Sequence, residues 1–387
     1  MSANLWASLD SGASKARALR RLLHAVPDLS GHEARTRDAV VSHLPEPTAV
    51  VPVADHGMIL RFGPPGPAVG VRAELDALPV QEQTDVAWAS TSGNMHACGH
   101  DVHLAAAAAL CHAVHTLELP VPLVLALQPR EETMPSGALD IIESGQLDRQ
   151  QVVTMIGAHV QPLLERGQVA CSGGSVNASS DEFQVVISGE GGHGAYPHLG
   201  ADPVLALSHF VTMVQQVVSR ESDPMAPAVV SVGEVHAGSS ANVRPDEARA
   251  SGIVRAMSAD HRTLVLRRIR EIAAAVAIAG GCTAQVEITG GEPVLVNDHE
   301  LAARTREHLD RSGIDTSIEI RSCGADDFAF YSAHVPSLMA FVGVGAAAGQ
   351  LHSPGFLPDE EVVDLTTTTL AAGYLASAGR YGLQAIG

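Results

Sequence analysis

The chain has few charged side chains and almost no lysine. Only 17% of its 387 residues are charged, and Lys15 is the one lysine among 24 basic residues. The 43 acidic residues set the formal charge at −19, which repels nucleic-acid phosphates and anionic membrane surfaces. We therefore expect neither a nucleic acid nor a membrane as a partner.

Long apolar runs and paired cysteines are also missing. No stretch approaches the roughly 18 consecutive apolar residues of a membrane helix, and residues 1–20 lack a basic start followed by an apolar stretch. The five cysteines are odd in number and form no C-x-x-C pair, so reduced thiols are expected. These absences predict a cytoplasmic protein.

The apolar content of 46% favours a well-buried globular protein, and the length predicts two domains. From about residue 66 onward, short apolar runs alternate with helical patterns. The runs lie at 68–78, 122–129 and 152–160, and the helical patterns at 101–117 and 137–145. This alternation predicts an α/β fold with a doubly wound, mostly parallel sheet, in which ligands bind beyond the carboxyl ends of the strands.

The pattern changes between residues 181 and 291. Four strand patterns and two helices follow one another as strand, helix, strand, strand, helix, strand. The first helix opens at Asp202, and the second runs from about Ser258 to Gly280. This split βαβ order predicts an inserted α+β domain whose four-stranded antiparallel sheet carries two helices on one face. The predicted domains are therefore 1–180 with 292–387, and 181–291.

The clearest local motif is HACGHDVH, just before a predicted helix. Its Cys98 and His100 lie two residues apart and can point toward one centre from an extended loop. They would offer a thiolate and an imidazole, which zinc and other late first-row divalent ions favour. Asp101 is placed to orient an imidazole. A chance cluster is the alternative in a chain with 19 histidines, and packing or surface positions are expected for His96, His103, His112 and His115.

Unusual polar residues gather where the predicted strands end: Glu74, Asp76, Glu131, Glu132 and His159. The adjacent carboxylates of Glu131 and Glu132 are costly at a strand end unless positive charge lies beside them, and a metal site is a common solution. One of the two can bind a metal while the other faces a reacting water. A solvated pair is the alternative, as is a structural role for His159 and for His352 in LHSP. Their convergence on one sheet edge favours a metal site.

The chain as a whole resembles metallopeptidase family 20, specifically the branch of hippurate hydrolases, indole-acetyl-amino-acid hydrolases and N-acyl-amino-acid amidohydrolases. The resemblance covers nearly the whole chain and rests on the order and spacing of its motifs. The resembling segments are RRLLHAVPDLSGHEARTRDAV, VRAELDALPVQE, NMHACGHDVHLA, LALQPREE with GALDIIESG, GAHVQP, GEGGHGAYPH with DPV, NVRPDEA, GIVRAM, GADDFAFY and LHSP.

This resemblance implies a metal-binding catalytic domain, a lid domain and two divalent ions per subunit. Zinc or manganese is expected, with cobalt or nickel as alternatives. The implied ligands are Cys98, His100, Glu132, His159 and His352. Glu131 matches the family's general base, and Asp76 matches the aspartate that supports the site. His193 matches a lid histidine that helps to bind the substrate carbonyl, often across a dimer interface, and Asn242 and Arg255 are similar to lid positions that contact substrate.

Three residues depart from the family pattern. Glu74 and Asp326 stand where many relatives carry aspartate and glutamate, respectively, and Arg244 occupies a usually apolar position. None of these removes an implied metal ligand. Arg244 is expected to alter the choice of substrate.

The resemblance implies that a homodimer paired through the lid hydrolyses the amide bond of small N-acyl amino acids or similar short amides. A metal-bridging water would be activated by a glutamate general base. A dipeptidase or aminopeptidase of the same family is the alternative. A metal-storing or catalytically silent binding protein would not need Glu131. A thiol enzyme built on Cys98 would leave the glutamate pair, His159 and His352 unexplained. The preferred acyl group and amino acid do not follow from the sequence.

Overall fold

The computed structural model describes residues 2–380, which fold into two compact units. The first unit comprises the chain up to Gly174, Val296–Ile320, and the residues from Asp327 onward; the second comprises Ser175–Leu295 and Arg321–Asp326. Among the described residues, no helix combines the length and apolarity needed to cross a membrane.

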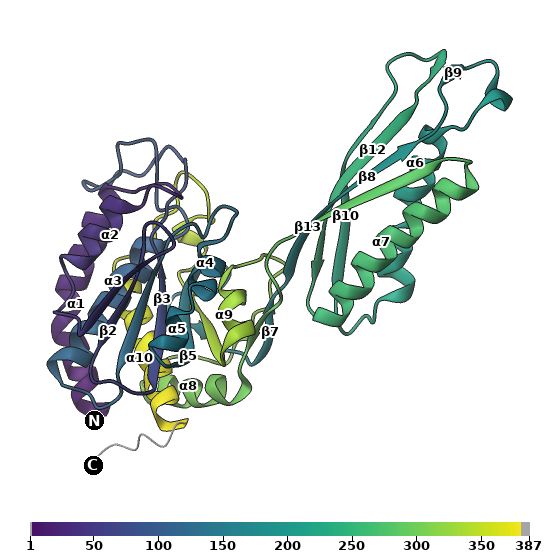
Figure 1. Cartoon of the computed structure of the whole chain (residues 1–387). Helices are drawn as coiled ribbons and strands as arrows, with labels where there is room; N and C mark the ends of the chain where they lie inside the picture. The colour runs from purple at the N-terminus through teal and green to yellow at the C-terminus, as the bar shows by residue number, and fades with distance from the viewer. Residues whose placement is uncertain (1, 381–387) are drawn as a thin grey trace. The chain divides into compact units, whose positions relative to one another are not determined.

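The first unit contains a seven-stranded sheet and eight α-helices within the described residues (Figure 1). The strands are β1 (Ala49–Val53), β2 (Gly57–Phe62), β3 (Ala68–Glu74), β4 (Leu123–Gln128), β5 (Val152–Gln161), β6 (Val169–Ala170) and β15 (Ser337–Gly343). The helices are α1 (Ser2–Ala25), α2 (Ala34–Val41), α3 (His100–Thr116), α4 (Gly137–Glu143), α5 (Gln146–Arg149), α8 (His299–Arg311), α9 (Phe328–His334) and α10 (Val362–Arg380).

The sheet has a parallel centre and antiparallel edges. Its order is β1-β2-β4-β3-β5-β15-β6, in which β4, β3, β5 and β15 are mutually parallel and the three outer pairings are antiparallel. Every residue of β3, β4 and β15 is buried, as expected for strands covered on both faces. Helices α1, α3, α8 and α10 pack together on one face, and α4, α5 and α9 on the other. The predicted doubly wound, mostly parallel sheet is therefore confirmed.

The second unit has a four-stranded antiparallel sheet in the order β10-β12-β8-β13. Its elements are β8 (Ser179–Ser188), β9 (Gly192–His193), α6 (Pro203–Met213), β10 (Ala228–Ala237), β11 (Val243–Arg244), β12 (Glu247–Ala256), α7 (Ala259–Ala279) and β13 (Thr283–Gly290). Strands β9 and β11 form a separate antiparallel pair. Two further short strands, β7 (Gly174–Asn177) and β14 (Leu295–Asn297), pair in the segments that connect the units. The predicted split βαβ order is confirmed.

Local sequence signals explain the two helices of this unit. The side chain of Asp202 accepts hydrogen bonds from the first-turn amides of α6, and Ser258 does the same for α7. Apolar side chains spaced three or four residues apart then face the sheet, among them Phe210 in α6 and Ile269 in α7. Helix α6 ends at Met213, and a wider helical turn over Val217–Glu221 continues the same buried face.

Candidate metal centre and active site

The polar residues that the sequence places at strand ends meet at one edge of the first unit's sheet. Asp76 follows β3, the two glutamates follow β4, and His159 lies near the end of β5. Cys98 and His100 come from the start of α3. The residues that gather here are Asp76, Cys98, His100, Glu131, Glu132, His159 and His352. This is the edge at which the sequence predicts a site.

Gly99 makes this arrangement of Cys98 and His100 feasible. It adopts a left-handed φ of 88°, and an added Cβ would lie 2.4 Å from a methyl carbon of Val160. A larger residue would therefore be strained twice, by its backbone conformation and by a steric clash. The glycine lets the chain turn sharply into α3, so that the side chains on either side of it face the same centre.

The Cys98 thiol lies between two imidazoles. Its sulfur is 3.4 Å from Nε2 of His159 and 3.3 Å from Nε2 of His352. His159 donates from Nδ1 to the Val160 carbonyl at 2.8 Å, which leaves its Nε2 lone pair directed at the sulfur. Burial and then the charges of Glu132 and Glu131 raise the pKa of the Cys98 thiol well above its ordinary value. Without a cation, these surroundings favour the neutral thiol.

His100 presents a similar free lone pair to two carboxylates. Its Nδ1 donates to the Asp76 carbonyl at 2.8 Å, so the buried Nε2 is left as an acceptor. This Nε2 has no hydrogen-bond partner and lies 3.7 Å from Glu131 and 3.9 Å from Glu132. Burial alone lowers the pKa of His100, but the charges of Glu74, Glu132 and Asp76 outweigh it and raise the pKa overall. The carboxylates therefore favour a cation on Nε2 of His100, either a proton or a metal ion.

Three buried acceptor atoms at this centre have no hydrogen-bond partner among residues 2–380: Oδ1 of Asp76, Nε2 of His100 and Oε1 of Glu132. Unsatisfied buried acceptors cost free energy unless a cation binds them. The donor atoms also fall into overlapping sets, each within 4.8 Å: Cys98–His100–His159, Cys98–Glu132–His352 and His100–Glu131–Glu132. Thiolate, imidazole and carboxylate donors in these three overlapping sets fit two late first-row divalent ions.

Several neighbours hold these donors in place. Oδ2 of Asp76 accepts hydrogen bonds from the Ser30 hydroxyl at 2.7 Å and from the Glu132 amide at 2.9 Å. His103 bridges the Glu74 carboxylate and the Val160 amide, each at 3.1 Å, beside His159. The sequence placed Ser30 only within a segment that resembles the family, and it placed His103 only at a packing or surface position. Their supporting contacts depend on chain segments that are distant in the sequence.

Asp101 was expected to orient an imidazole, but it does not contact a histidine of the candidate metal site. Its carboxylate accepts hydrogen bonds from Arg20 and His24, both in α1, rather than from His100. His100 is instead oriented by the Asp76 carbonyl. Since α3 turns successive side chains by about 100°, Asp101 points away from the site toward α1.

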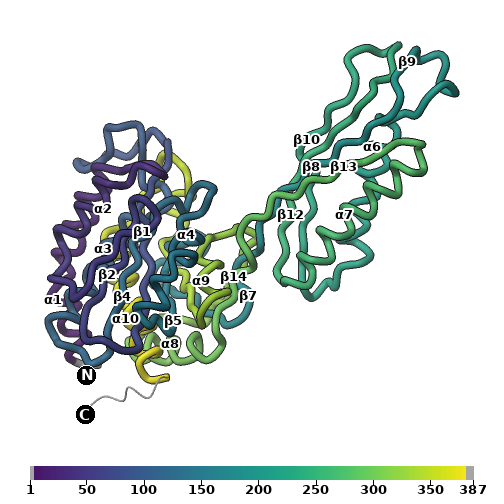
Figure 2. The backbone as a smooth tube through the Cα atoms, viewed as in Figure 1, coloured from purple at the N-terminus to yellow at the C-terminus, as the bar shows by residue number. Residues whose placement is uncertain are grey.

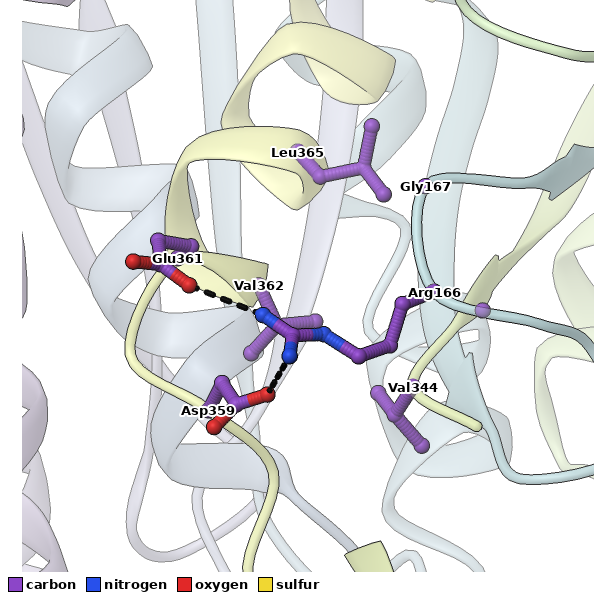
Figure 3. Close-up of a pocket in the computed structure, with 8 residues that line it drawn as sticks. Arg166, Gly167, Val344, Asp359, Glu361, Val362 and Leu365 are labelled. Atoms are coloured by element: carbon purple, nitrogen blue, oxygen red, sulfur yellow. Dashed lines mark hydrogen bonds and ion pairs between the residues drawn. The ribbon is translucent and has the colours of Figure 1, made fainter. Parts of the chain in front are cut away.

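The segment after β5 is tied to the segment that follows His352. The guanidinium of Arg166 bridges Asp359 at 2.8 Å and Glu361 at 2.9 Å, beside Val362 and Leu365 (Figure 3). His352 itself adopts a left-handed φ of 62°, and its amide donates to the Ala97 carbonyl at 2.8 Å. The loop that carries His352 is therefore held to the segment after β5 by Arg166 and to the segment before α3 by its contact with Ala97.

His193 and Asn242 lie next to each other in the second unit. His193 pairs in register with Val243 across β9 and β11, and the adjacent Gly194 donates its amide to the Asn242 carbonyl at 2.8 Å. Arg244 is buried and donates to the carbonyls of Glu190 and Pro197. It thus braces the loop around His193, which gives it a positional role in addition to the expected effect on substrate choice.

Arg255 lies at the opposite end of the same sheet. In the β12–β8 register, Glu247 pairs with Ser188 beside the β9–β11 end, whereas Arg255 pairs with Ser180, where the chain enters the unit. Eight residues of strand separate these positions, or roughly 26 Å at about 3.3 Å per residue. Figures 1 and 2 show β9 beyond one end of the four-stranded sheet. Within a single second unit, Arg255 and His193 are therefore too far apart to contact the same small molecule.

Comparisons with known proteins agree with this architecture. The model of "Peptidase family M20/M25/M40" matches residues 70–372. An N-acetyldiaminopimelate deacetylase of Bacillus cytotoxicus is 32% identical over 361 residues, covering 91% of this chain and 95% of that protein. An N-acetyl-L-cysteine deacetylase of Bacillus subtilis is 35% identical over 356 residues, covering 89% and 84%.

A solved structure gives the same result. The Bacillus subtilis YXEP protein, described as a dinuclear metal-binding peptidase of the M20 family, is 30% identical and superposes with a TM-score of 0.83. The match covers 95% of this chain and 99% of that one. The two-unit fold, the donor-rich sheet edge and these similarities show that the chain belongs to peptidase family M20/M25/M40 and is a metal-dependent amidohydrolase.

Proposed function

We propose that this enzyme removes the acyl group from small N-acyl amino acids or similar short amides at a dinuclear centre. The observation that carries the proposal is the cluster of donors at the sheet edge, with three buried acceptors that lack a donor. Two relatives that share most of the chain are named as deacetylases of N-acetylated amino acids. A dipeptidase or aminopeptidase of the same family is the alternative, and the same assay distinguishes it.

The residues proposed to hold the metal ions are Cys98, His100, Glu132, His159 and His352. Glu132 suits this role because its Oε1 lies 3.5 Å from His352 and 3.9 Å from His100, so that it belongs to two donor sets. When bound, divalent ions lower the pKa of water toward about 7 and polarise a carbonyl oxygen. The donor types are compatible with zinc or manganese, and also with cobalt or nickel.

Metal analysis tests this part of the proposal. We expect about two divalent ions per chain after reconstitution, since the donors form overlapping sets that fit two ions. A chelator should abolish amidase activity, and added metal should restore it. Elemental analysis that finds no bound metal, together with activity that a chelator leaves intact, would overturn the metal centre.

Glu131 is proposed to accept a proton from the attacking water and to return it to the leaving amine. Its carboxylate is 3.7 Å from Nε2 of His100, and its side chain is 11% exposed, so it borders the donor cluster and remains accessible. Asp76 supports the cluster through its contacts with Ser30 and the Glu132 amide. His193 would donate to the oxyanion that develops on the substrate carbonyl, a type of contact commonly worth about 3–4 kcal/mol.

The thiol-enzyme alternative conflicts with the surroundings of Cys98. A nucleophilic cysteine needs a lowered pKa, but burial and the nearby carboxylates raise that of Cys98. Two imidazole nitrogens that face the same sulfur are better explained by shared binding of a cation. A ligating thiolate is also suited to a reducing compartment, and we place the enzyme in the cytoplasm.

The substrate is proposed to carry a free carboxylate that Arg255 binds. For N-acetyl-, benzoyl- or indole-acetyl-amino acids we expect kcat/KM to exceed that of matched amides without a carboxylate by roughly 100-fold or more. Dipeptides and longer peptides belong in the same panel. Preference for long peptides, or for esters without a carboxylate, over every N-acyl amino acid tested would contradict this proposal.

A matched pair of arginines in β12 sharpens the experiment. Arg249 and Arg255 are six residues apart in one strand, so their side chains leave the same face of the sheet. Arg255→Gln should reduce the preference for a carboxylate, whereas Arg249→Gln should leave it unchanged. Equal effects of the two substitutions would show that Arg255 has no special contact with substrate.

We further propose that residues 181–291 act as a lid and pair two chains into a homodimer. The edge strands β10 and β13 leave unpaired backbone groups, and β13 has no register shift in its pairing with β8. Apolar side chains near His193 are exposed, including Tyr196 at 54%, Leu199 at 64% and Val243 at 52%. The separation of Arg255 from His193 supports contributions from two chains to each site.

A further inference from the structure

Arg20 of α1 is fully buried, and its three guanidinium nitrogens donate hydrogen bonds to two segments that are distant in the sequence. Its Nε donates to Asp101 at 3.1 Å, and its two terminal nitrogens donate to the carbonyls of Asp359 at 3.0 Å and Pro358 at 2.9 Å. Asp101 follows His100 in the first turn of α3, and Pro358 lies six residues beyond His352. One guanidinium therefore joins the start of α3 to the loop that carries His352.

His24, one helical turn after Arg20, extends the same network. Its Nδ1 is 3.0 Å from Asp101 and its Nε2 is 3.1 Å from Glu82, and all three side chains are buried. A carboxylate faces each ring nitrogen, so an imidazole that carries protons on both nitrogens satisfies both contacts. Burial alone lowers the pKa of His24, but Asp101 and Glu82 outweigh it and raise the pKa. The Arg20 guanidinium and the His24 ring thus lie against the carboxylates of Asp101 and Glu82.

The network also includes the loop over residues 79–95. Glu82 accepts a hydrogen bond from the Ser90 amide at 2.6 Å, and the neighbouring Gln83 amide donates to the Pro354 carbonyl at 2.8 Å. The Arg20 guanidinium lies over the Trp88 ring, 5.5 Å from its centroid, and the His24 ring makes an edge contact with Trp88 at a centroid distance of 4.8 Å. The 79–95 loop, the start of α3 and the His352 loop are therefore fixed to α1 at one point.

We propose that Arg20 and His24 are positioning residues of the metal centre, which set the separation of the Cys98–His100 segment from His352. The proposal rests on the metal-dependent function argued above. It also gives a physical role to the amino-terminal segment RRLLHAVPDLSGHE, whose Ser30 contacts Asp76 directly. Buried ion pairs suit this purpose, because their geometry is restrictive and a lost partner leaves a buried charge uncompensated.

The test measures metal affinity rather than activity alone. Arg20→Lys keeps the charge but replaces a fixed fork of donors with a single ammonium group. His24→Gln keeps much of the side-chain volume but faces one of the two carboxylates with an acceptor. In competition with a chelating dye, we expect both variants to bind cobalt(II) about 10–100-fold more weakly than the unmodified protein. The visible spectrum of bound cobalt should also change.

Arg21→Gln provides the matched control. Arg21 is the next residue in α1 and pairs with Glu360 in the same segment, but its side chain is 48% exposed. Exposed pairs contribute little, so cobalt affinity should stay within about twofold. Circular dichroism and thermal unfolding identify any variant that does not fold, and the other variant then carries the test.

The outcomes separate this inference from the proposed function. Unmodified protein that binds no metal would overturn the function itself. Unmodified protein that binds cobalt, with folded Arg20→Lys or His24→Gln protein binding it equally well and with the same spectrum, would overturn only the positioning role. Weaker binding in the Arg21→Gln control to the same extent would also overturn it, because the effect would then not be specific to the buried network.

Discussion

Glu131→Gln is expected to retain the fold and the bound metal but to lose nearly all turnover. A neutral amide cannot take a proton from the attacking water, and general-base contributions amount to roughly 10²–10⁴-fold. The substitution preserves the size of a side chain that borders the donor cluster. Steady-state kinetics and elemental analysis of the same preparation measure the two properties side by side.

Glu132→Gln is the natural comparison, because it makes the same chemical change one residue away. Glu132 lies within reach of both His100 and His352, so its loss should weaken metal binding by about tenfold or more. Activity should then recover at high metal concentration more fully than in Glu131→Gln. If Glu131→Gln kept near-normal kcat while Glu132→Gln kept its metal and lost activity, the two roles would have to be exchanged.

The central sheet could be predicted because its strands are local apolar runs between helices. Strands such as β3 and β4 are buried along their whole length, and that pattern is visible in the sequence. The edge hairpin β1–β2 lies before residue 66, outside the alternation. Its turn has positive φ at Ala54 and Asp55 rather than at an Asn-Gly or Asp-Gly pair, so the sequence offers no strong turn signal.

A metal site could be predicted from the sequence because Glu132 and His159 are unusual at strand ends and Cys98 and His100 share one short motif, while the full ligand set followed from the family resemblance. Cys98, His159 and His352 then meet as expected of donors from one sheet edge. The residues that hold them could not be found in this way. Asp101 was expected to orient an imidazole, and the imidazole that it contacts is that of His24, which lies 77 residues earlier in α1. Which histidine such a carboxylate contacts depends on tertiary packing, which the local sequence does not show.

The register of the lid sheet adds information that motifs lack. Asn242 and Arg255 are 13 residues apart and both were expected to contact substrate. The structure places Asn242 beside His193 at one end of the sheet and Arg255 at the other. For both to act on one small substrate, they have to come from different chains. A dimeric enzyme with shared sites is therefore our expectation, and a monomer whose own lid supplies His193 is the rival.

Mixing two inactive variants distinguishes these arrangements, and we expect activity to return. In a heterodimer of Glu131→Gln and His193→Ala chains, one site combines an intact Glu131 with an intact His193 from the other chain. The second site lacks both. Random exchange makes about half of the dimers mixed, so roughly one quarter of the unmodified activity should be recovered if each site is shared.

A self-contained site gives the opposite result, because every chain in the mixture then carries one inactivating change in its own site. Subunit exchange must be verified, for example with two affinity tags and recovery of doubly tagged dimers. Arg249→Gln mixed with Glu131→Gln serves as a control for exchange alone, since Arg249 is not among the residues proposed to bind metal, to bind substrate or to act in catalysis, and its variant should be active by itself. No recovery after verified exchange, or full activity in a monomer at working concentration, would rule out the shared site. Recovery near one quarter would instead assign His193 to the partner's centre.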